Sequence, residues 1–128
     1  MVRRKHLSST ILIVDDEAEV ADTCARVLRR SGFDCMVAYD SPAAHALFDS
    51  LQPALVLSEI ILPTGDGYEI ASYVRRKSPT TPVILMAAYH SSSVPGRVAR
   101  AGAAHYLRKP FSKDEVTFAI KSVLGSGR

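Results

Sequence analysis

The chain has 128 residues, of which 47% are hydrophobic and 23% are charged, and its formal net charge is +3. This length suits one domain with a single core, and the apolar content is typical of a globular fold and not of a disordered chain. No apolar run approaches about 18 residues, so we expect no membrane span. The run Thr10–Val14 that follows the basic residues 3–5 is too short for a secretory signal. These features predict a cytoplasmic protein.

The basic excess is spread over tails and helix ends and does not form one basic helix with interleaved aromatic residues. We therefore expect no direct binding of nucleic acid by this domain. The two cysteines, Cys24 and Cys35, have neither CxxC spacing nor a companion histidine cluster. We predict two reduced and mostly buried thiols.

The first half of the chain alternates between short apolar runs and amphipathic stretches. Thr10–Val14 is a β-branched run typical of a strand buried on both faces, and residues at helical spacing follow it up to a stop glycine. Cys35–Tyr39 is predicted to be the second strand. Ser41 is predicted to be the N-cap of a second helix, because Pro42 suits the first helical position. Ala54–Leu57 predicts a third strand.

The second half continues this alternation. A turn cluster at residues 62–67 leads into a third helix. The helix expected over Val94–Ala101 contains a proline and a glycine, which should shorten or fray it. Ser112 and Glu115 match a capping box that begins the last helix, which continues to Leu124. The two remaining predicted strands are Val83–Ala87 and Tyr106–Leu107.

Five strand–helix repeats of this length predict an α/β fold with a doubly wound parallel sheet. Connections of this kind between buried strands favour parallel pairing and right-handed crossovers, so helices should cover both faces. In open sheets of this type, ligands bind beyond the C-terminal ends of the strands. The residues at those ends are therefore the candidate functional residues.

Three carboxylates and one ammonium follow the predicted strands. Asp15 and Asp16 come after the first strand, Glu59 after the third and Lys109 after the fifth. Neighbouring carboxylates repel one another, and a hard divalent cation such as Mg²⁺ accepts oxygen ligands. The Lys109 ammonium would neutralise a further negative charge. This set suits phosphoryl chemistry, in which positioning and charge neutralisation provide most of the catalysis.

Each of these residues also has a simpler interpretation on its own. Asp15 and Asp16 could be an N-cap pair for the first helix, Glu59 a solvated carboxylate at a strand end, and Lys109 a loop lysine. Their joint placement at one sheet edge favours a shared site.

The sequence resembles a receiver (response regulator) domain of two-component signalling from about Ile11 to Leu124. The segments that carry this resemblance are Ile11-Leu12-Ile13-Val14-Asp15-Asp16-Glu17, Leu55-Val56-Leu57-Ser58-Glu59-Ile60-Ile61-Leu62-Pro63, Gly65-Asp66-Gly67, Ala101-Gly102-Ala103, Tyr106-Leu107 and Lys109-Pro110-Phe111. The resemblance implies a receiver domain over residues 9–124, between a basic tail at 1–8 and a tail or linker at 125–128. It also implies a flavodoxin-like fold of five parallel strands in the order 2-1-3-4-5, flanked by five helices.

The same resemblance implies roles for the strand-end residues. Asp15 and Asp16 would bind Mg²⁺, the backbone carbonyl of Ile61 would be a third protein ligand, and the Lys109–Pro110 peptide would be cis. Such a domain is a signalling module and not an enzyme. Its expected partners are a sensor histidine kinase and an output protein or domain.

Two positions depart from the family pattern, and both belong to the phosphorylation chemistry. Glu59 stands where the family has the phosphoacceptor aspartate, and Ala87 stands where it has a hydroxyl-bearing Ser or Thr. The extra methylene of Glu59 moves its carboxylate towards Lys109 and the metal site, and a misplacement near 1 Å can cost about a hundredfold in rate. We predict an atypical receiver in which Glu59 pairs with Lys109 or shares a metal with Asp15 and Asp16.

Three alternatives remain open. Glu59 could accept a phosphoryl group as in a conventional Mg²⁺-dependent response regulator, or it could be an engineered mimic of phosphorylation. An unrelated Mg²⁺-dependent phosphatase would need an aspartate nucleophile and a general acid two positions later, whereas Ile60 and Ile61 follow Glu59 here.

The resemblance also predicts the surface that acts. Tyr106 holds the position of the family's aromatic switch residue, which turns inward when the residue at position 87 moves. The face formed by the fourth helix, the fifth strand and the last helix would bind output partners or pair with a second copy. The polar stretch 90–96 should reorganise with it.

Overall fold

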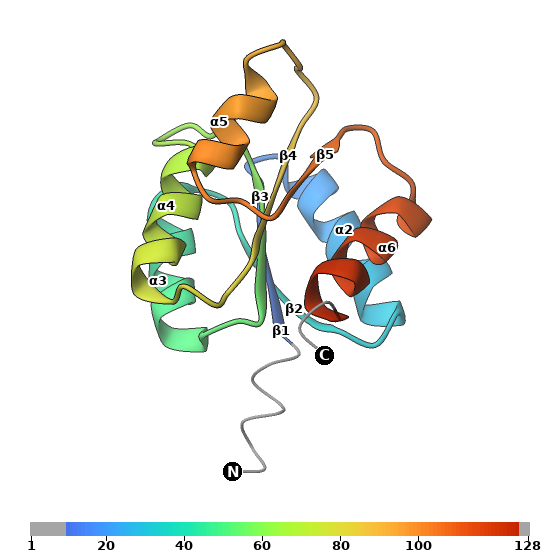
Figure 1. Ribbon diagram of the computed structural model, residues 1–128. Helices are drawn as coiled ribbons and strands as arrows, with labels where there is room; N and C mark the ends of the chain where they lie inside the picture. The colour runs from blue at the N-terminus through green and yellow to red at the C-terminus, as the bar shows by residue number, and fades with distance from the viewer. Residues whose placement is uncertain (1–9, 126–128) are drawn as a thin grey trace.

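The computed structural model describes residues 10–125 as alternating strands and helices (Figure 1). The elements are β1 (Thr10–Val14), α2 (Ala18–Arg30), β2 (Asp34–Ala38), α3 (Ser41–Leu51), β3 (Leu55–Glu59), α4 (Gly67–Lys77), β4 (Val83–Ala87), α5 (Val94–Arg100), β5 (His105–Arg108) and α6 (Lys113–Gly125). The predicted tail at 1–8 and all but the first residue of the predicted C-terminal segment lie outside the described residues.

The five strands form one parallel sheet in the order β2-β1-β3-β4-β5. Helices α2 and α6 cover one face of it, and α3, α4 and α5 cover the other (Figure 1). This arrangement confirms the predicted flavodoxin-like fold. The order reverses between β1 and β3, so the C-terminal ends of these two strands border the crevice in which such folds bind ligands.

Each face of the sheet buries its own apolar core. Alternate residues of β1 point to opposite faces, so Leu12 joins the core under α3, α4 and α5, while Ile11 and Ile13 join the core under α2 and α6. All residues of β3 and β4 are buried. Three central strands covered on both sides provide a rigid base for the side chains at their ends.

The structure corrects one predicted cap and shifts the bounds of three predicted strands. The N-cap of α3 is Asp40 and not Ser41, because the Asp40 carboxylate accepts a hydrogen bond of 2.8 Å from the Ala43 amide. Strand β2 begins and ends one residue earlier than predicted, and β3 runs from Leu55 to Glu59. Strand β5 extends one residue beyond the predicted strand at each end. The capping box of α6 is confirmed, with reciprocal hydrogen bonds between Ser112 and Glu115.

One further feature agrees with the sequence analysis. The Lys109–Pro110 peptide is cis. Within residues 10–125, no helix has both the length and the apolar character that crossing a bilayer requires.

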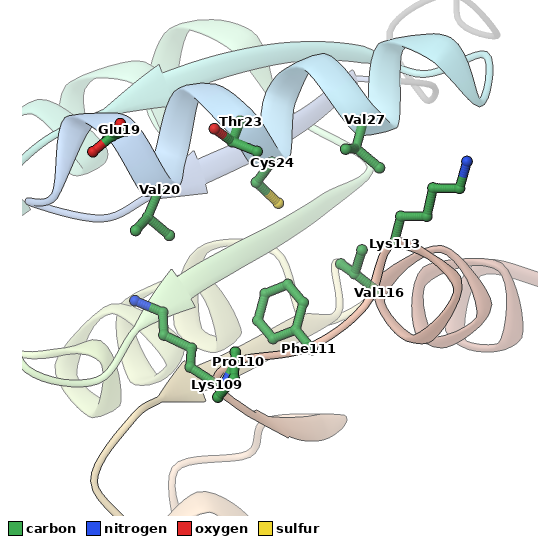
Figure 2. Close-up of a pocket in the computed structure, with 10 residues that line it drawn as sticks. All are labelled: Glu19, Val20, Thr23, Cys24, Val27, Lys109, Pro110, Phe111, Lys113 and Val116. Atoms are coloured by element: carbon green, nitrogen blue, oxygen red, sulfur yellow. The ribbon is translucent and has the colours of Figure 1, made fainter.

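The two cysteines are free and buried. Cys24 lies in an apolar groove of about 440 Å³ between α2 and α6, and Val20, Val27 and Phe111 also line it (Figure 2). Burial, followed by the charge of Cys35, raises the pKa of the Cys24 thiol from 9.0 to about 12. Burial also raises the pKa of Cys35, to about 11.

Both thiols are therefore expected to be unreactive towards Ellman's reagent in the folded protein. A rise in pKa from 9.0 to about 12 lowers the thiolate fraction of Cys24 about a thousandfold, and the thiolate is the nucleophile. Stopped-flow absorbance at pH 8 should show slow labelling in buffer and fast labelling of both cysteines in denaturant. Equal rates in the two conditions would contradict the burial of these thiols.

Candidate functional site

The site forms where β1, β3 and β5 end at the same edge of the sheet. Val14 pairs with Ser58 in the parallel register, so the next residues of the two strands, Asp15 and Glu59, lie side by side. Lys109 follows β5, and its backbone amide donates a 2.9 Å hydrogen bond to the carbonyl of Ala87 at the end of β4. The register of the sheet thus brings together residues separated by up to 94 positions.

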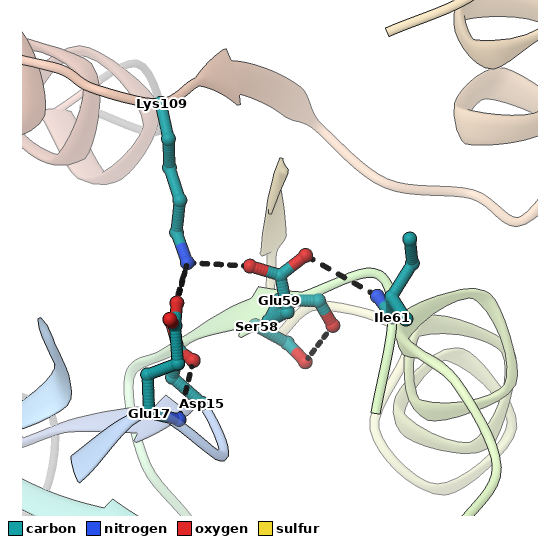
Figure 3. Close-up of polar contacts among 6 residues, drawn as sticks. All are labelled: Asp15, Glu17, Ser58, Glu59, Ile61 and Lys109. Atoms are coloured by element: carbon teal, nitrogen blue, oxygen red, sulfur yellow. Dashed lines mark hydrogen bonds and ion pairs between the residues drawn. The ribbon is translucent and has the colours of Figure 1, made fainter. Parts of the chain in front are cut away.

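The Lys109 ammonium is the centre of the site (Figure 3). Its Nζ donates to Oδ2 of Asp15 at 2.7 Å and to Oε1 of Glu59 at 2.5 Å. A third carboxylate oxygen, Oε1 of Glu17, lies 3.8 Å away. The side chains of Asp15, Glu59 and Lys109 are 0%, 9% and 11% exposed, whereas that of Glu17 is 67% exposed. The two short contacts are therefore shielded from water.

Opposing effects act on the pKa of Lys109. Burial lowers it. The hydrogen bonds to Asp15 and Glu59 and the negative charges of both carboxylates together raise it by more, so that the net shift of the pKa is upward from 10.5. The ammonium is therefore charged at neutral pH. It neutralises part of the charge that two buried carboxylates place at this edge.

Glu59 is fixed at both oxygens. Oε1 accepts the Lys109 ammonium, and Oε2 accepts a hydrogen bond of 3.3 Å from the backbone amide of Ile61 (Figure 3). The Ser58 hydroxyl donates to the backbone carbonyl of Glu59 at 3.0 Å. The Glu59 carboxylate thus lies within the charged site and is not directed into solvent.

Gly67 allows the segment after Glu59 to pack closely against α4. A Cβ built at this position would overlap the Glu59 carbonyl oxygen and lie 2.9 Å from Cα of Ile60. The Gly67 amide donates to the Ile60 carbonyl at 2.7 Å. A side chain would therefore displace the backbone that positions Glu59.

Gly67→Ala is expected to lower the free energy of unfolding by about 1–3 kcal/mol, because overpacking against backbone atoms cannot relax by a side-chain rotation. Urea denaturation followed by circular dichroism measures this loss. Gly125→Ala is the matched control, because a Cβ at Gly125 meets no atom within 4 Å. An equal effect of the two substitutions would show that the contact at Gly67 is unimportant.

The oxygen atoms at the site are of the kind that Mg²⁺ prefers as ligands. Two of them, on Asp15 and Glu59, already accept hydrogen bonds from the Lys109 ammonium. Asp15 accepts from Lys109 through Oδ2 and from the Glu17 amide through Oδ1. Asp16 is exposed and makes no hydrogen bond or ion pair with any residue that the structure describes. Among residues 10–125, no three acidic, histidine or cysteine side chains converge as a ready metal site. A metal ion here would compete with Lys109 for the same carboxylates.

Ala87 and Tyr106, the two other predicted site residues, belong to the core under α5. Ala87 is 2% exposed, and the partly buried Tyr106 ring packs against the same core. The Tyr106 hydroxyl lies 3.2 Å from Nδ1 of His90, and the two rings stack with centroids 5.7 Å apart. Burial is the main cause of a raised pKa of Tyr106.

Sequence analysis did not identify Glu17 or His90 as site residues. The Glu17 carboxylate is the third to approach Lys109, with Oε1 at 3.8 Å from Nζ. It is also the N-cap position of α2, where its side chain makes no capping hydrogen bond. The alternative that Asp15 and Asp16 are the N-cap pair is therefore wrong, although Asp15 does accept the Glu17 amide at 3.0 Å.

Comparison with known proteins gives consistent matches over almost the whole chain. Residues 11–121 match the model of the response regulator receiver domain. The chain is 34% identical over 120 residues to the phosphate regulon transcriptional regulatory protein PhoB of Pseudomonas aeruginosa. It is 36% identical over 119 residues to the sensory transduction protein RegX3 of Mycobacterium bovis. These alignments cover 92% and 93% of the chain, which spans about half of the length of each relative (52%).

Solved structures show the same fold. A response regulator receiver domain protein (CheY-like) from Methanospirillum hungatei JF-1 superposes with a TM-score of 0.89 at 26% identity, covering 93% of this chain and 95% of that one. A putative response regulator from Chloroflexus aurantiacus J-10-fl gives a TM-score of 0.85 at 31% identity and covers 92% and 98%.

Proposed function

The chain belongs to the response regulator receiver domain family, and from this membership we propose that it is an atypical receiver of two-component signalling that acts through protein contacts without conventional phosphorylation. The observation that carries the proposal is the pair formed by Glu59 and Lys109, whose atoms lie 2.5 Å apart in a nearly buried site. In this proposal the Glu59 carboxylate takes part of the place of a transferred phosphoryl group.

The position of Glu59 argues against phosphoryl transfer to it. A nucleophilic carboxylate must present a free oxygen in line with the phosphorus atom of the donor, and small displacements cost much of the rate. Oε1 of Glu59 is held by Lys109 and Oε2 by the amide of Ile61. Moving the side chain into an attacking position would break at least one of these contacts.

The residue at position 87 supports the same proposal. A hydroxyl there would donate a hydrogen bond to a phosphoryl group, and alanine removes that donor. The side chain of Ala87 is buried and apolar. A phosphorylated Glu59 would therefore lack one of the contacts that hold the product and report its presence.

Magnesium has a limited role in this proposal. Asp15, Asp16 and the carbonyl of Ile61 would hold the ion, with Glu59 as a further ligand, and its charge would offset the local excess of carboxylates. Because Asp15 and Glu59 already share the Lys109 ammonium, we expect weak binding.

Histidine kinases and output proteins or domains are the proposed partners, since the matched relatives are regulatory proteins of about twice this length. The domain works as a signalling module and not as an enzyme. Whether Glu59 is natural or an introduced mimic of phosphorylation, its carboxylate would fix the same local arrangement.

The test is incubation of the protein with acetyl phosphate and Mg²⁺, followed by intact mass spectrometry. We expect no gain of a phosphoryl group. A gain that maps to Glu59 after peptide sequencing would overturn the proposal in favour of the conventional phospho-accepting receiver, which is the second candidate function.

A further inference from the structure

The apolar groove of about 440 Å³ between α2 and α6 has no role in the charged site (Figure 2). Its apolar lining comes from one face of α2 and from the segment that leads into α6, namely Val20, Cys24, Val27, Pro110, Phe111 and Val116. Pockets that bind small molecules have volumes of this order and are also mostly apolar with a few polar groups. We call this feature the α2–α6 groove.

The α2–α6 groove is elongated along α2. Val20, Cys24 and Val27 recur at helical spacing, so they lie on one face of α2 and span about two turns, or about 10 Å. Cys24 and Val116 are buried, whereas Val20 and Val27 are half-buried beside them. An extended apolar chain laid along α2 would therefore contact apolar side chains over its whole length.

The face around this groove lacks a protruding apolar side chain. The large apolar side chains that residues 10–125 expose are Met36, Tyr39, Ile61, Tyr89 and Phe118, and none of them lines the groove. A second copy docked symmetrically on this face would therefore present a hollow to a hollow. A slender ligand fills the groove without such a side chain.

The two lysines that line the groove differ in the availability of their charge. The aliphatic stem of Lys109 contributes to the lining, but its ammonium binds Asp15 and Glu59. Lys113 is exposed and forms no ion pair with any residue of the range 10–125. It precedes Val116 by three residues on α6, so the two side chains share one face of that helix. The Lys113 ammonium is therefore free to meet an anion at the groove.

The charges at the two ends of the groove differ in sign. Glu19 lines the groove next to Val20, at the end opposite Lys113 (Figure 2). Asp114 and Glu115, the acidic residues in the first turn of α6, do not line it. A ligand with one carboxylate on an apolar chain thus has a single favourable orientation, with its head at Lys113 and its chain directed towards Val20.

We propose that the α2–α6 groove binds a small amphiphile with a carboxylate head and an unbranched apolar chain, as in a medium-chain fatty acid. The carboxylate pairs with Lys113, and the chain lies along Val20, Cys24 and Val27 and against the Phe111 ring. This inference goes beyond the proposed function and does not depend on it, because the ligand makes no contact with the Glu59 carboxylate.

The test is titration of the isotope-labelled protein with octanoate, octanol and octylamine, which share one apolar chain and differ in their head group. Amide NMR spectra should show saturable shifts at Cys24, Val27 and Val116 with octanoate, weaker binding of octanol and no binding of octylamine. Hexanoate should bind about tenfold more weakly than octanoate, because it buries a shorter chain. Equal binding of the three head groups, shifts outside the groove or no saturable shift would each overturn the proposal.

Lys113→Glu should weaken octanoate binding about tenfold and leave octanol binding unchanged. The matched control is Lys121→Glu, which makes the same change in charge at an exposed position of α6 that does not line the groove. An equal loss in this control would contradict the role of Lys113. A dimer in sedimentation that Val27→Ser dissociates and octanoate leaves intact would assign the groove to a second copy instead. Because neither Mg²⁺ nor a phosphodonor is present, failure here is distinguishable from failure of the proposed function.

Discussion

Combined replacement of Glu59 by Asp and Ala87 by Thr is expected to make the protein a phosphate acceptor. Removing one methylene withdraws the carboxylate from Lys109 and leaves space for a phosphoryl group, and the threonine supplies the missing hydroxyl donor at the end of β4. In-line transfer depends on placement, so we expect the rate with acetyl phosphate and Mg²⁺ to rise by about a hundredfold or more. Intact mass spectrometry over time measures it.

The single substitutions separate the two contributions. Glu59→Asp alone should accept a phosphoryl group but hold it less well than the double variant, because Ala87 provides no hydroxyl. Ala87→Thr alone should remain unmodified, because both Glu59 oxygens are still engaged. Phosphorylation of Ala87→Thr at Glu59 would contradict the role assigned to the glutamate.

Replacing Lys109 by Met is expected to lower the free energy of unfolding by about 3–5 kcal/mol at neutral pH, the usual cost of removing one partner from a buried charge cluster. Asp15 and Glu59 would then face each other with no compensating cation, and their side chains are only 0% and 9% exposed. Urea denaturation measures the loss. Mg²⁺ should restore part of the stability, because the divalent ion can replace the ammonium between the carboxylates.

The pH dependence of this loss has a definite sign. The pKa of Lys109 is raised in the folded protein, so its stabilising contribution is fully present below the ordinary value of 10.5 and disappears as the pH rises through the higher folded value. The difference between the native protein and Lys109→Met should therefore shrink only above about pH 10.5 on the alkaline side.

Lys121→Met is the control for this experiment, since Lys121 is exposed and forms no ion pair with another described residue. It should change the free energy of unfolding by less than about 0.5 kcal/mol. If Lys109→Met changed it no more than Lys121→Met, the Lys109 contacts would not stabilise the fold.

The fold and the central charged residues were predictable because strong local patterns agree with one topology. Apolar runs such as Thr10–Val14 predicted the positions of the strands. The order of strands and helices predicted that the C-terminal ends of the strands meet at one edge of the sheet. The short distances from Lys109 to Asp15 and Glu59 follow from this register. Residues far apart in the chain could therefore be assigned to one site from the sequence.

Features that depend on side-chain orientation were not predictable in the same way. Asp40 and Ser41 are both good N-cap residues, and the backbone angles at the start of α3 decide between them. The contact between His90 and Tyr106 depends on the path of a loop that periodicity does not specify. The cation–π contact between Arg97 and the Tyr68 ring likewise depends on side-chain orientation.

The central claim is that the Glu59 carboxylate takes part of the place of a transferred phosphoryl group. It is tested most directly by amide NMR spectra of the protein with Mg²⁺, recorded before and after addition of beryllofluoride, which mimics an acyl phosphate. We expect small, gradual shifts with Mg²⁺ near Asp15 and Asp16, and no further change at Ile61, Lys109 or Tyr106 with beryllofluoride. A new set of resonances in slow exchange that extends to Tyr106 would contradict the claim.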